Sequence, residues 1–285
     1  MKFFKIRLIT LLISAIWCGI TYAEIRYHCP KDSAKVMELV GKAKNGDTYS
    51  QRIVAAAKAL QGVPFAKAAD NDSLGTIMIR LDSLNQREFV YMALAAAKTA
   101  ELSVPGIRDF ERNLENISRK KGKDEGFHSQ FLYGADWVVD NTYRGNLKEM
   151  TEYVEGGNFR TKTLDYVSRH PELFPALANP ETLEKIKVIE LGYRSHRIPH
   201  LKKHNINNRN IKDLFQDGDI IIMSSPDSDF DIYDIGIISI ENGEPTLIHI
   251  SRENNEVRID PYPIGRLFKI ENQFFYGFRW LRPIE

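Results

Sequence analysis

Apolar residues recur at helical spacing between about residues 32 and 121. Asp47 and Thr48 can cap a helix whose apolar face lies within residues 53–60. Two further apolar faces cover residues 89–97 and 110–117. Because residues three and four apart share one side of a helix, this spacing predicts helices that bury one face each.

From about residue 213 the pattern changes to short segments rich in β-branched and aromatic residues, separated by turn sequences. The segments are 219–223, 235–240, 246–250, 256–259 and 274–281. Strands spaced by about ten residues favour an antiparallel sheet or a small barrel. We therefore expect an α+β fold in one domain, with a helical part over about 24–200 and a β-rich part over about 210–285.

The N-terminus has the parts of a secretory signal peptide. Positive residues come first, an apolar run covers residues 8–20, and Ala23 ends a small-x-small cleavage site. The run is shorter than the roughly 20 apolar residues of a membrane span, which disfavours a membrane anchor. We expect residues 1–23 to be removed and the protein to be exported, either to the periplasm or out of the cell. No integral membrane segment is expected after cleavage.

Charge and cysteine content exclude two classes of protein. The 39 Lys and Arg residues nearly balance the 38 Asp and Glu residues, so a nucleic-acid-binding surface is not indicated. Of the two cysteines, Cys18 lies in the expected signal peptide and Cys29 remains alone. The mature chain therefore depends on an ordinary core, not on a disulfide framework. A residue so close to the chain terminus is also a poor candidate for a catalytic nucleophile.

Three stretches of the chain resemble a known family. They are GVPF at 62–65 with IRLDSLNQREFVY at 79–91; FLYGADWVVDN at 131–141; and DGDII at 217–221, DIYDIG at 231–236 and LIH at 247–249. The chain is similar in these stretches to the NlpC-type superfamily of papain-like cell-wall hydrolases, and more closely to its bacterial N-acetylmuramoyl-L-alanine amidase-like family. The resemblance implies a papain-like fold, with the nucleophile at the N-terminus of a buried helix that packs on a small antiparallel sheet.

The resemblance also implies that the reaction centre has been substituted. The family's cysteine nucleophile corresponds to Gln86, its histidine base to Asp234, and its tyrosine to Phe65, whereas His249 stands at the position that orients the base. Acyl transfer by this route needs a thiolate and a base that generates it. A carboxamide has neither a removable proton nor a nucleophilic lone pair. We therefore interpret the protein as an exported pseudoenzyme that binds a muropeptide or another peptidoglycan fragment.

Two other functions stay open. Glu88, one turn along the helix, could join Asp234 and His249 in activating water, which would make the protein an amidase or peptidase with a non-cysteine mechanism. Alternatively, the fold could serve an unidentified protein partner, although the sequence shows no recognition stripe for one.

The second stretch supplies candidate substrate-binding residues, Trp137, Tyr133, Asp136 and Asn141. The alternative is a core position for the two aromatic residues and a solvated helical face for Asp136. His196, His200 and His204 recur every four residues, which on a helix is typical of a metal site, but Pro199 interrupts the pattern. We expect no metal and no cofactor.

Overall fold

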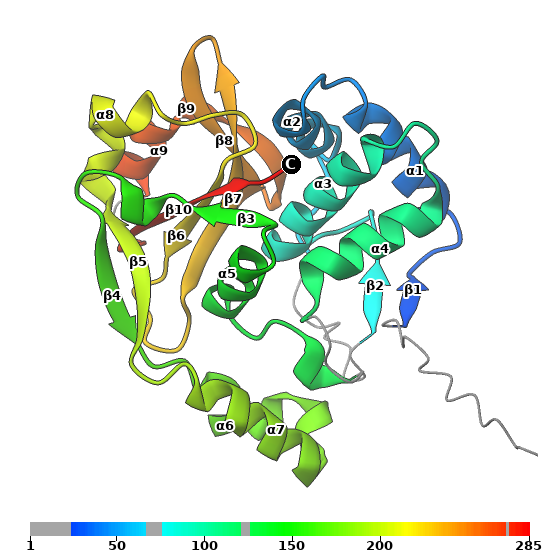
Figure 1. Cartoon of the computed structure of the whole chain (residues 1–285), viewed down its shortest axis with the longest axis vertical. Helices are drawn as coiled ribbons and strands as arrows, with labels where there is room; N and C mark the ends of the chain where they lie inside the picture. The colour runs from blue at the N-terminus through cyan, green and yellow to red at the C-terminus, as the bar shows by residue number, and fades with distance from the viewer. Residues whose placement is uncertain (1–23, 67–75, 121–125, 272–273) are drawn as a thin grey trace, which may run out of the picture.

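The computed structural model describes residues 24–66, 76–120, 126–271 and 274–285. The expected signal peptide lies outside the described residues. Within them, no helix is long and apolar enough to cross a membrane. The chain has a mixed α+β architecture in which a layer of helices faces an antiparallel sheet (Figure 1).

The helical layer contains four helices and a short parallel strand pair. The helices are α1 (Asp32–Ala43), α2 (Tyr49–Ala59), α3 (Gln86–Ala100) and α4 (Ile107–Ser118), and β1 (Ile25–Tyr27) pairs with β2 (Ile77–Ile79). Thr48 caps α2 in a reciprocal arrangement with Gln51, which confirms the cap read from the sequence. The helices predicted over 89–97 and 110–117 are also confirmed.

The main sheet has eight strands. Seven follow the order β4-β5-β10-β6-β7-β8-β9, and β3 pairs with β10. The bounds are β3 Leu147–Glu149, β4 Asn158–Lys162, β5 His196–Lys202, β6 Ile220–Ser224, β7 Ile232–Glu241, β8 Glu244–Ser251, β9 Glu256–Pro263 and β10 Gly277–Pro283. All of these pairings are antiparallel. The five strands predicted after residue 213 are confirmed.

The predicted helical part over about 24–200 is wrong in its second half, because β3, β4 and β5 belong to the main sheet. In β5, residues 198–201 are buried one after another. A strand covered on both faces has no polar-apolar alternation, so it is hard to recognise in a sequence. The histidines at 196 and 200 therefore lie on a strand.

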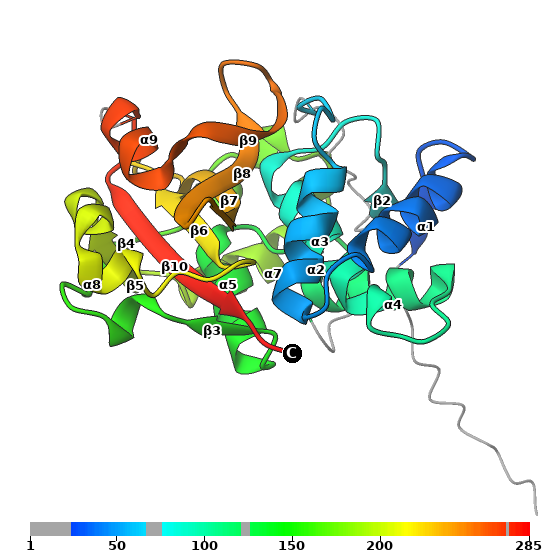
Figure 2. The ribbon, with the colours of Figure 1, turned by 90° about the horizontal axis from the view of Figure 1, so that it is seen from above.

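Helix α3 connects the two layers (Figure 2). Phe89 and Val90 are fully buried and share one apolar core with Ile235 of β7 and Ile248 of β8. This packing directs the first turn of α3 at the middle of the sheet. A second cluster lies on the other face of the sheet and includes Trp280.

Helices α6 (Tyr166–Arg169) and α7 (Pro180–Leu191) project beside the sheet, whereas α5 (Gly134–Tyr143) lies between the sheet and the helical layer (Figure 1). Tyr133, Leu164 and Ile186 belong to the separate apolar cluster of this region. Figure 1 shows α6 and α7 at the end of the molecule away from α8 (Arg209–Lys212) and α9 (Ile264–Ile270). The segment that contains α6 supplies one wall of the cleft described below.

Candidate functional site

The first turn of α3 is stabilised by hydrogen bonds between residues within that turn. The Asn85 side chain accepts hydrogen bonds from the backbone N–H groups of Arg87 and Glu88, at 3.0 and 2.9 Å. Glu88 Oε2 in turn accepts from the backbone N–H of Asn85 at 2.8 Å. This reciprocal cap fixes where the helix begins, so Gln86 is its first residue. The Gln86 side chain is left to point toward β7.

Three side chains form a hydrogen-bonded chain from α3 into the sheet. Gln86 Nε2 donates to Asp234 Oδ1 at 2.9 Å, and Asp234 Oδ2 lies 2.7 Å from His249 Nδ1. The pairing of β7 with β8 accounts for the second contact. Gly236 lies opposite His249, so Asp234, two residues away on the same face, is the diagonal neighbour of His249. The structure thus brings Gln86, Asp234 and His249 together from three different elements.

Asp234 and His249, the two inner residues of this hydrogen-bonded chain of side chains, are shielded from solvent. Asp234 is 2% exposed and His249 is 5% exposed, whereas Gln86 is partly exposed. On its other side, His249 Nε2 lies 3.6 Å from Asp260 Oδ2 of β9, which is an ion-pair separation and too long for a hydrogen bond. Burial by itself would lower the pKa of His249. The charge and hydrogen bond of Asp234, together with Asp260, outweigh burial and raise this pKa to about 9.

This pKa predicts how stability depends on pH. The folded protein holds the His249 proton more tightly than the unfolded chain, where the pKa is near 6.5. The stabilisation is therefore complete below pH 6.5 and is lost as the pH rises through about 9. A shift of this size corresponds to roughly 3 kcal/mol. We expect the free energy of unfolding of the wild type to fall by that amount relative to a His249→Gln variant across this range.

The comparison with His249→Gln is needed because a second buried group titrates in the opposite sense. Burial, with the nearby Arg160 charge, lowers the pKa of Lys162 to about 8, so Lys162 adds stability as the pH rises further. Both proteins contain Lys162, and its contribution cancels in the difference between their urea unfolding free energies. A difference that does not change with pH would show that the His249 imidazole is neutral in the folded protein.

A cleft of about 430 Å³ opens above the chain of three side chains. Gln86 lines it, together with Phe65 and the first-turn residues Arg87 and Glu88. Its far wall is aromatic and contains Tyr133, Tyr166, Phe174 and Phe230. The rings of Tyr166 and Phe230 pack with their centroids 4.8 Å apart. Gln86 is therefore the group through which the buried Asp234–His249 pair meets the cleft.

Glu88 is engaged elsewhere. Besides capping α3, its carboxylate lies 3.3 Å from the guanidinium of Arg80, whose side chain is largely buried. Its hydrogen bonds run to Asn85, the N-cap of α3, and to Arg80, which follows β2. A carboxylate with these partners has a structural role, which weakens the hypothesis that Glu88 activates water.

Two of the candidate substrate-binding residues are core residues, which corrects the expectation from the sequence. Trp137 is 0% exposed, and its indole N–H donates to Ile117 O at 2.9 Å. Asn141 is also fully buried and donates to Trp137 O at 2.9 Å. Neither side chain can touch a ligand at the surface. Both connect α5 to the end of α4.

Asp136 and Tyr133 have different positions. Asp136 does not lie on a solvated face, because it is buried, pairs with Lys120 at 2.8 Å and accepts from the Tyr193 hydroxyl at 2.9 Å. Tyr133 is mostly buried and donates to Glu190 at 2.6 Å. Its ring nevertheless lines the cleft, so of these four candidates Tyr133 is placed to contact a ligand.

No group of three or more metal-binding side chains occurs among the residues that the structure describes. His200 is buried in β5, where burial and the charges of Arg160 and Lys202 lower its pKa to about 4. Cys29 is a free thiol near β1. These residues do not join the Gln86 cleft.

Sequence reasoning missed several residues of the site. Asp260 had no signal beyond its place near a predicted strand, and its contact with His249 depends on the pairing of β8 with β9. Asp231, which the sequence favours as a loop carboxylate and which is therefore not a missed residue, accepts from the backbone N–H groups of Gly134, at 3.1 Å, and Ala135, and it thereby ties the loop before β7 to the start of α5. Of the aromatic wall, Tyr166, Phe174 and Phe230 were not recognised, since they lie far apart in the sequence from Tyr133 and the other site residues.

Solved structures of the same fold include proteins that are named as amidases. A crystal structure of an N-acetylmuramoyl-L-alanine amidase from Bacteroides uniformis is 26% identical, with a TM-score of 0.73 over 83% of this chain and 99% of that one. A putative xylanase from Bacteroides fragilis is 26% identical, with a TM-score of 0.70 over 79% of this chain and 98% of that one. A Legionella pneumophila protein, 14% identical with a TM-score of 0.68 over 90% of this chain and 95% of that one, shows the fold alone.

The fold and its neighbours thus define an amidase-like protein. The family model of N-acetylmuramoyl-L-alanine amidase-like (AmiA-like) proteins matches residues 55–272, and the chain belongs to this family. A search of curated proteins found no match.

Proposed function

We propose that this AmiA-like protein binds a muropeptide or a related peptidoglycan fragment in the Gln86 cleft and does not cleave it. The observation that supports the proposal is the chain of Gln86, Asp234 and His249, in which a carboxamide occupies the first position of α3. In the papain-like arrangement that we propose for this fold, that position belongs to the nucleophile. Asp234 then stands in place of the base, His249 in place of the orienting residue, and Phe65 in place of the tyrosine.

The contacts of these groups argue against amide hydrolysis. Gln86 Nε2 donates both to Asp234 and, at 3.4 Å, to the backbone oxygen of Tyr233. The carboxamide is thereby held in place with its oxygen as the remaining acceptor. At neutral pH a histidine with a pKa of about 9 is protonated and cannot act as a general base. The centre therefore has neither a nucleophile nor a free base.

The cleft nevertheless suits a ligand. Its volume of 430 Å³ lies within the range of small-molecule sites, and aromatic walls with a few polar groups are typical of them. The Gln86 oxygen can accept a hydrogen bond from an amide N–H of a peptide stem. Tyr166 and Phe230 offer exposed ring surface beside it. A cell-wall fragment carries both an amide bond and larger groups on either side of that bond.

The proposed signal peptide would bring the protein to the periplasm or the exterior, where such fragments occur. The competing hypothesis of a working amidase or peptidase requires Glu88, whose carboxylate already caps α3 and pairs with Arg80. The aromatic cleft is explained without a protein partner. We therefore favour recognition of a cell-wall fragment over both alternatives.

The proposal predicts binding without turnover. Isothermal titration of the mature protein with N-acetylmuramoyl peptides should give a dissociation constant of about 1–100 µM, and chromatography of the same mixture should show the amide bond intact. Replacing Phe230, which is 45% exposed in the cleft wall, by alanine should weaken binding about tenfold through the loss of ring contact.

Phe159→Ala is the matched control, because Phe159 is similarly exposed but lies on β4 outside the cleft lining. It should leave the dissociation constant unchanged. Release of free peptide at a rate that depends on His249 or Asp234 would contradict the proposal. Equal effects of the two phenylalanine variants would place the ligand outside this cleft.

A further inference from the structure

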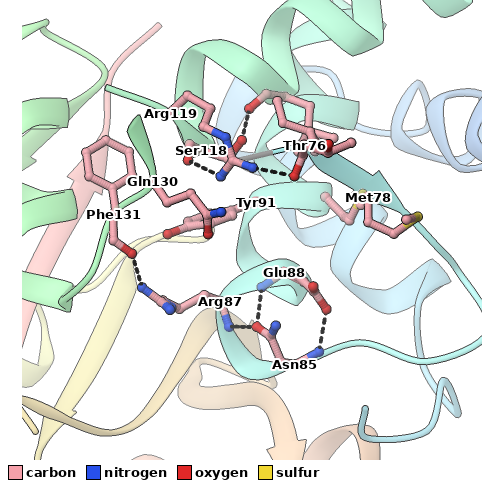
Figure 3. Close-up of a pocket in the computed structure, with 13 residues that line it drawn as sticks. Thr76, Met78, Asn85, Arg87, Glu88, Tyr91, Ser118, Arg119, Gln130 and Phe131 are labelled. Atoms are coloured by element: carbon pink, nitrogen blue, oxygen red, sulfur yellow. Dashed lines mark hydrogen bonds between the residues drawn. The ribbon is translucent and has the colours of Figure 1, made fainter. Parts of the chain in front are cut away.

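A second cavity of about 120 Å³ lies beside the first turn of α3 (Figure 3). It shares Asn85, Arg87 and Glu88 with the Gln86 cleft, so the two cavities adjoin across this turn. Tyr91, one helical turn further along α3, and Thr76, next to β2, contribute their side chains to its lining. A space of this size holds more than one water molecule or a small group of heavy atoms.

Two hydroxyl groups in this cavity are buried without a hydrogen-bond partner. Tyr91 is 9% exposed, and neither its hydroxyl nor that of Thr76 finds a partner within the described part of the chain. Leaving a buried hydroxyl unpaired destabilises a protein, so such groups are rare in structures without a functional reason. Trp137 packs against the Tyr91 ring, with centroids 5.5 Å apart, which keeps the phenol in place.

The charges around the cavity favour an anion. Arg87 and Arg119 lie close enough for their charges to act on the Tyr91 hydroxyl, and Asp136 and Glu88 act on it with the opposite sign. Asp136 is paired with Lys120. The one carboxylate in the lining, Glu88, is already paired with Arg80. Burial is the main cause that raises the pKa of Tyr91 to about 12, so the phenol keeps its proton and remains a hydrogen-bond donor at physiological pH.

We propose that this cavity is a carboxylate-binding subsite, in which the Tyr91 and Thr76 hydroxyls donate to the anion beside the guanidinium groups of Arg87 and Arg119. Arg87 is fixed by donating to Phe131 O at 2.8 Å, and Arg119 by donating to Thr76 O at 2.6 Å. Because the cavity adjoins the cleft, a fragment held at Gln86 can place a carboxylate of its peptide stem there. The identity of this ligand rests on the proposed function, whereas the subsite itself does not.

The first experiment removes the Tyr91 hydroxyl, which has no hydrogen-bond partner among the described residues of the protein without ligand. In Tyr91→Phe, the protein without ligand loses only an unsatisfied buried group, so its melting temperature should stay the same or rise by roughly 2–4 °C. Sodium acetate should stabilise the wild type saturably, relative to sodium chloride at equal concentration, and should not stabilise Tyr91→Phe. Thr76→Val tests the second hydroxyl in the same way if Tyr91→Phe does not fold.

The second arm measures ligand preference. The wild type should bind N-acetylmuramoyl-L-alanyl-D-glutamate about tenfold more tightly than the same compound with both glutamate carboxylates amidated, and Tyr91→Phe should lose most of this preference. Tyr27→Phe is the matched control, because the Tyr27 hydroxyl does have a partner, Glu111 Oε1 at 2.7 Å. It should lower the melting temperature and leave the acid-over-amide preference intact.

The outcomes separate the two proposals. A wild type that acetate does not stabilise and that does not prefer the acid would overturn the subsite. So would a Tyr91→Phe variant that is less stable without ligand but keeps the full preference, because the hydroxyl would then have a structural role. Saturable stabilisation by acetate, with neither muramoyl compound binding, would support the subsite and overturn the cell-wall fragment as its ligand.

Discussion

Replacing Asp234 by alanine is expected to lower the free energy of unfolding at neutral pH by about 3–5 kcal/mol, as measured by urea denaturation. Asp234 is buried, lies 2.7 Å from His249 Nδ1 and accepts from the backbone N–H of Ile235 at 2.8 Å. Its removal leaves the His249 imidazolium in the core with only the more distant Asp260 as a charge partner. His249 must then lose its proton, or its buried positive charge remains poorly compensated.

Glu184→Ala is the matched control for a carboxylate in an ion pair. Glu184 Oε1 lies 2.7 Å from Lys187 Nζ on the surface of α7, where both side chains are exposed. Exposed pairs contribute about 0–1 kcal/mol, so this change should have little effect. If both variants lowered the free energy of unfolding equally, the contacts of Asp234 would contribute no more to stability than an exposed ion pair does.

The double change Gln86→Cys with Asp234→His is expected to create a reactive thiol. The 2.9 Å separation between Gln86 and Asp234 shows that side chains at these positions meet. An imidazolium beside a thiol stabilises the thiolate and lowers the cysteine pKa from about 8.5, so alkylation by iodoacetamide at pH 7 should become at least about tenfold faster than for an ordinary cysteine. Release of peptide from an N-acetylmuramoyl peptide would be the stronger result.

The single Gln86→Cys variant provides the comparison. There the new thiol lies beside the Asp234 carboxylate, which disfavours the thiolate, so labelling should be slower than in the double variant. Both are made with Cys29→Ser, because Cys29 is a partly exposed free thiol that would add background labelling. Equal labelling rates would contradict the proposal that these two positions form the former reaction centre.

Local sequence predicted α2, α3 and α4 and five of the eight strands of the main sheet. The cap of α2 involves residues only a few positions apart, so its signal is present without any tertiary information. Strands β6 to β9 follow one another through short connections, and α9 lies between β9 and β10. In contrast, β4 and β5 pair with each other and β5 also pairs with β10, which comes at the end of the chain. A single strand gives no indication of a partner so distant in sequence.

The site was partly predictable for a different reason. The positions of Gln86, Asp234 and His249 came from a resemblance in sequence, and the structure brings their side chains within hydrogen-bond distance. The same resemblance suggested Trp137 and Asn141 as ligand contacts, but both are core residues. A motif shows which residue types stand in a segment, whereas burial depends on what the rest of the chain packs against that segment.

The sequence by itself determined the side-chain chemistry at position 86: a carboxamide cannot attack an amide, whatever surrounds it. It also determined the α+β class, because helical and strand periodicities are properties of short segments. Only the tertiary structure decided the protonation of His249 between two carboxylates, the aromatic wall of the cleft and the unpaired hydroxyl of Tyr91. These depend on desolvation and on contacts between distant segments, which exist only once the chain is packed.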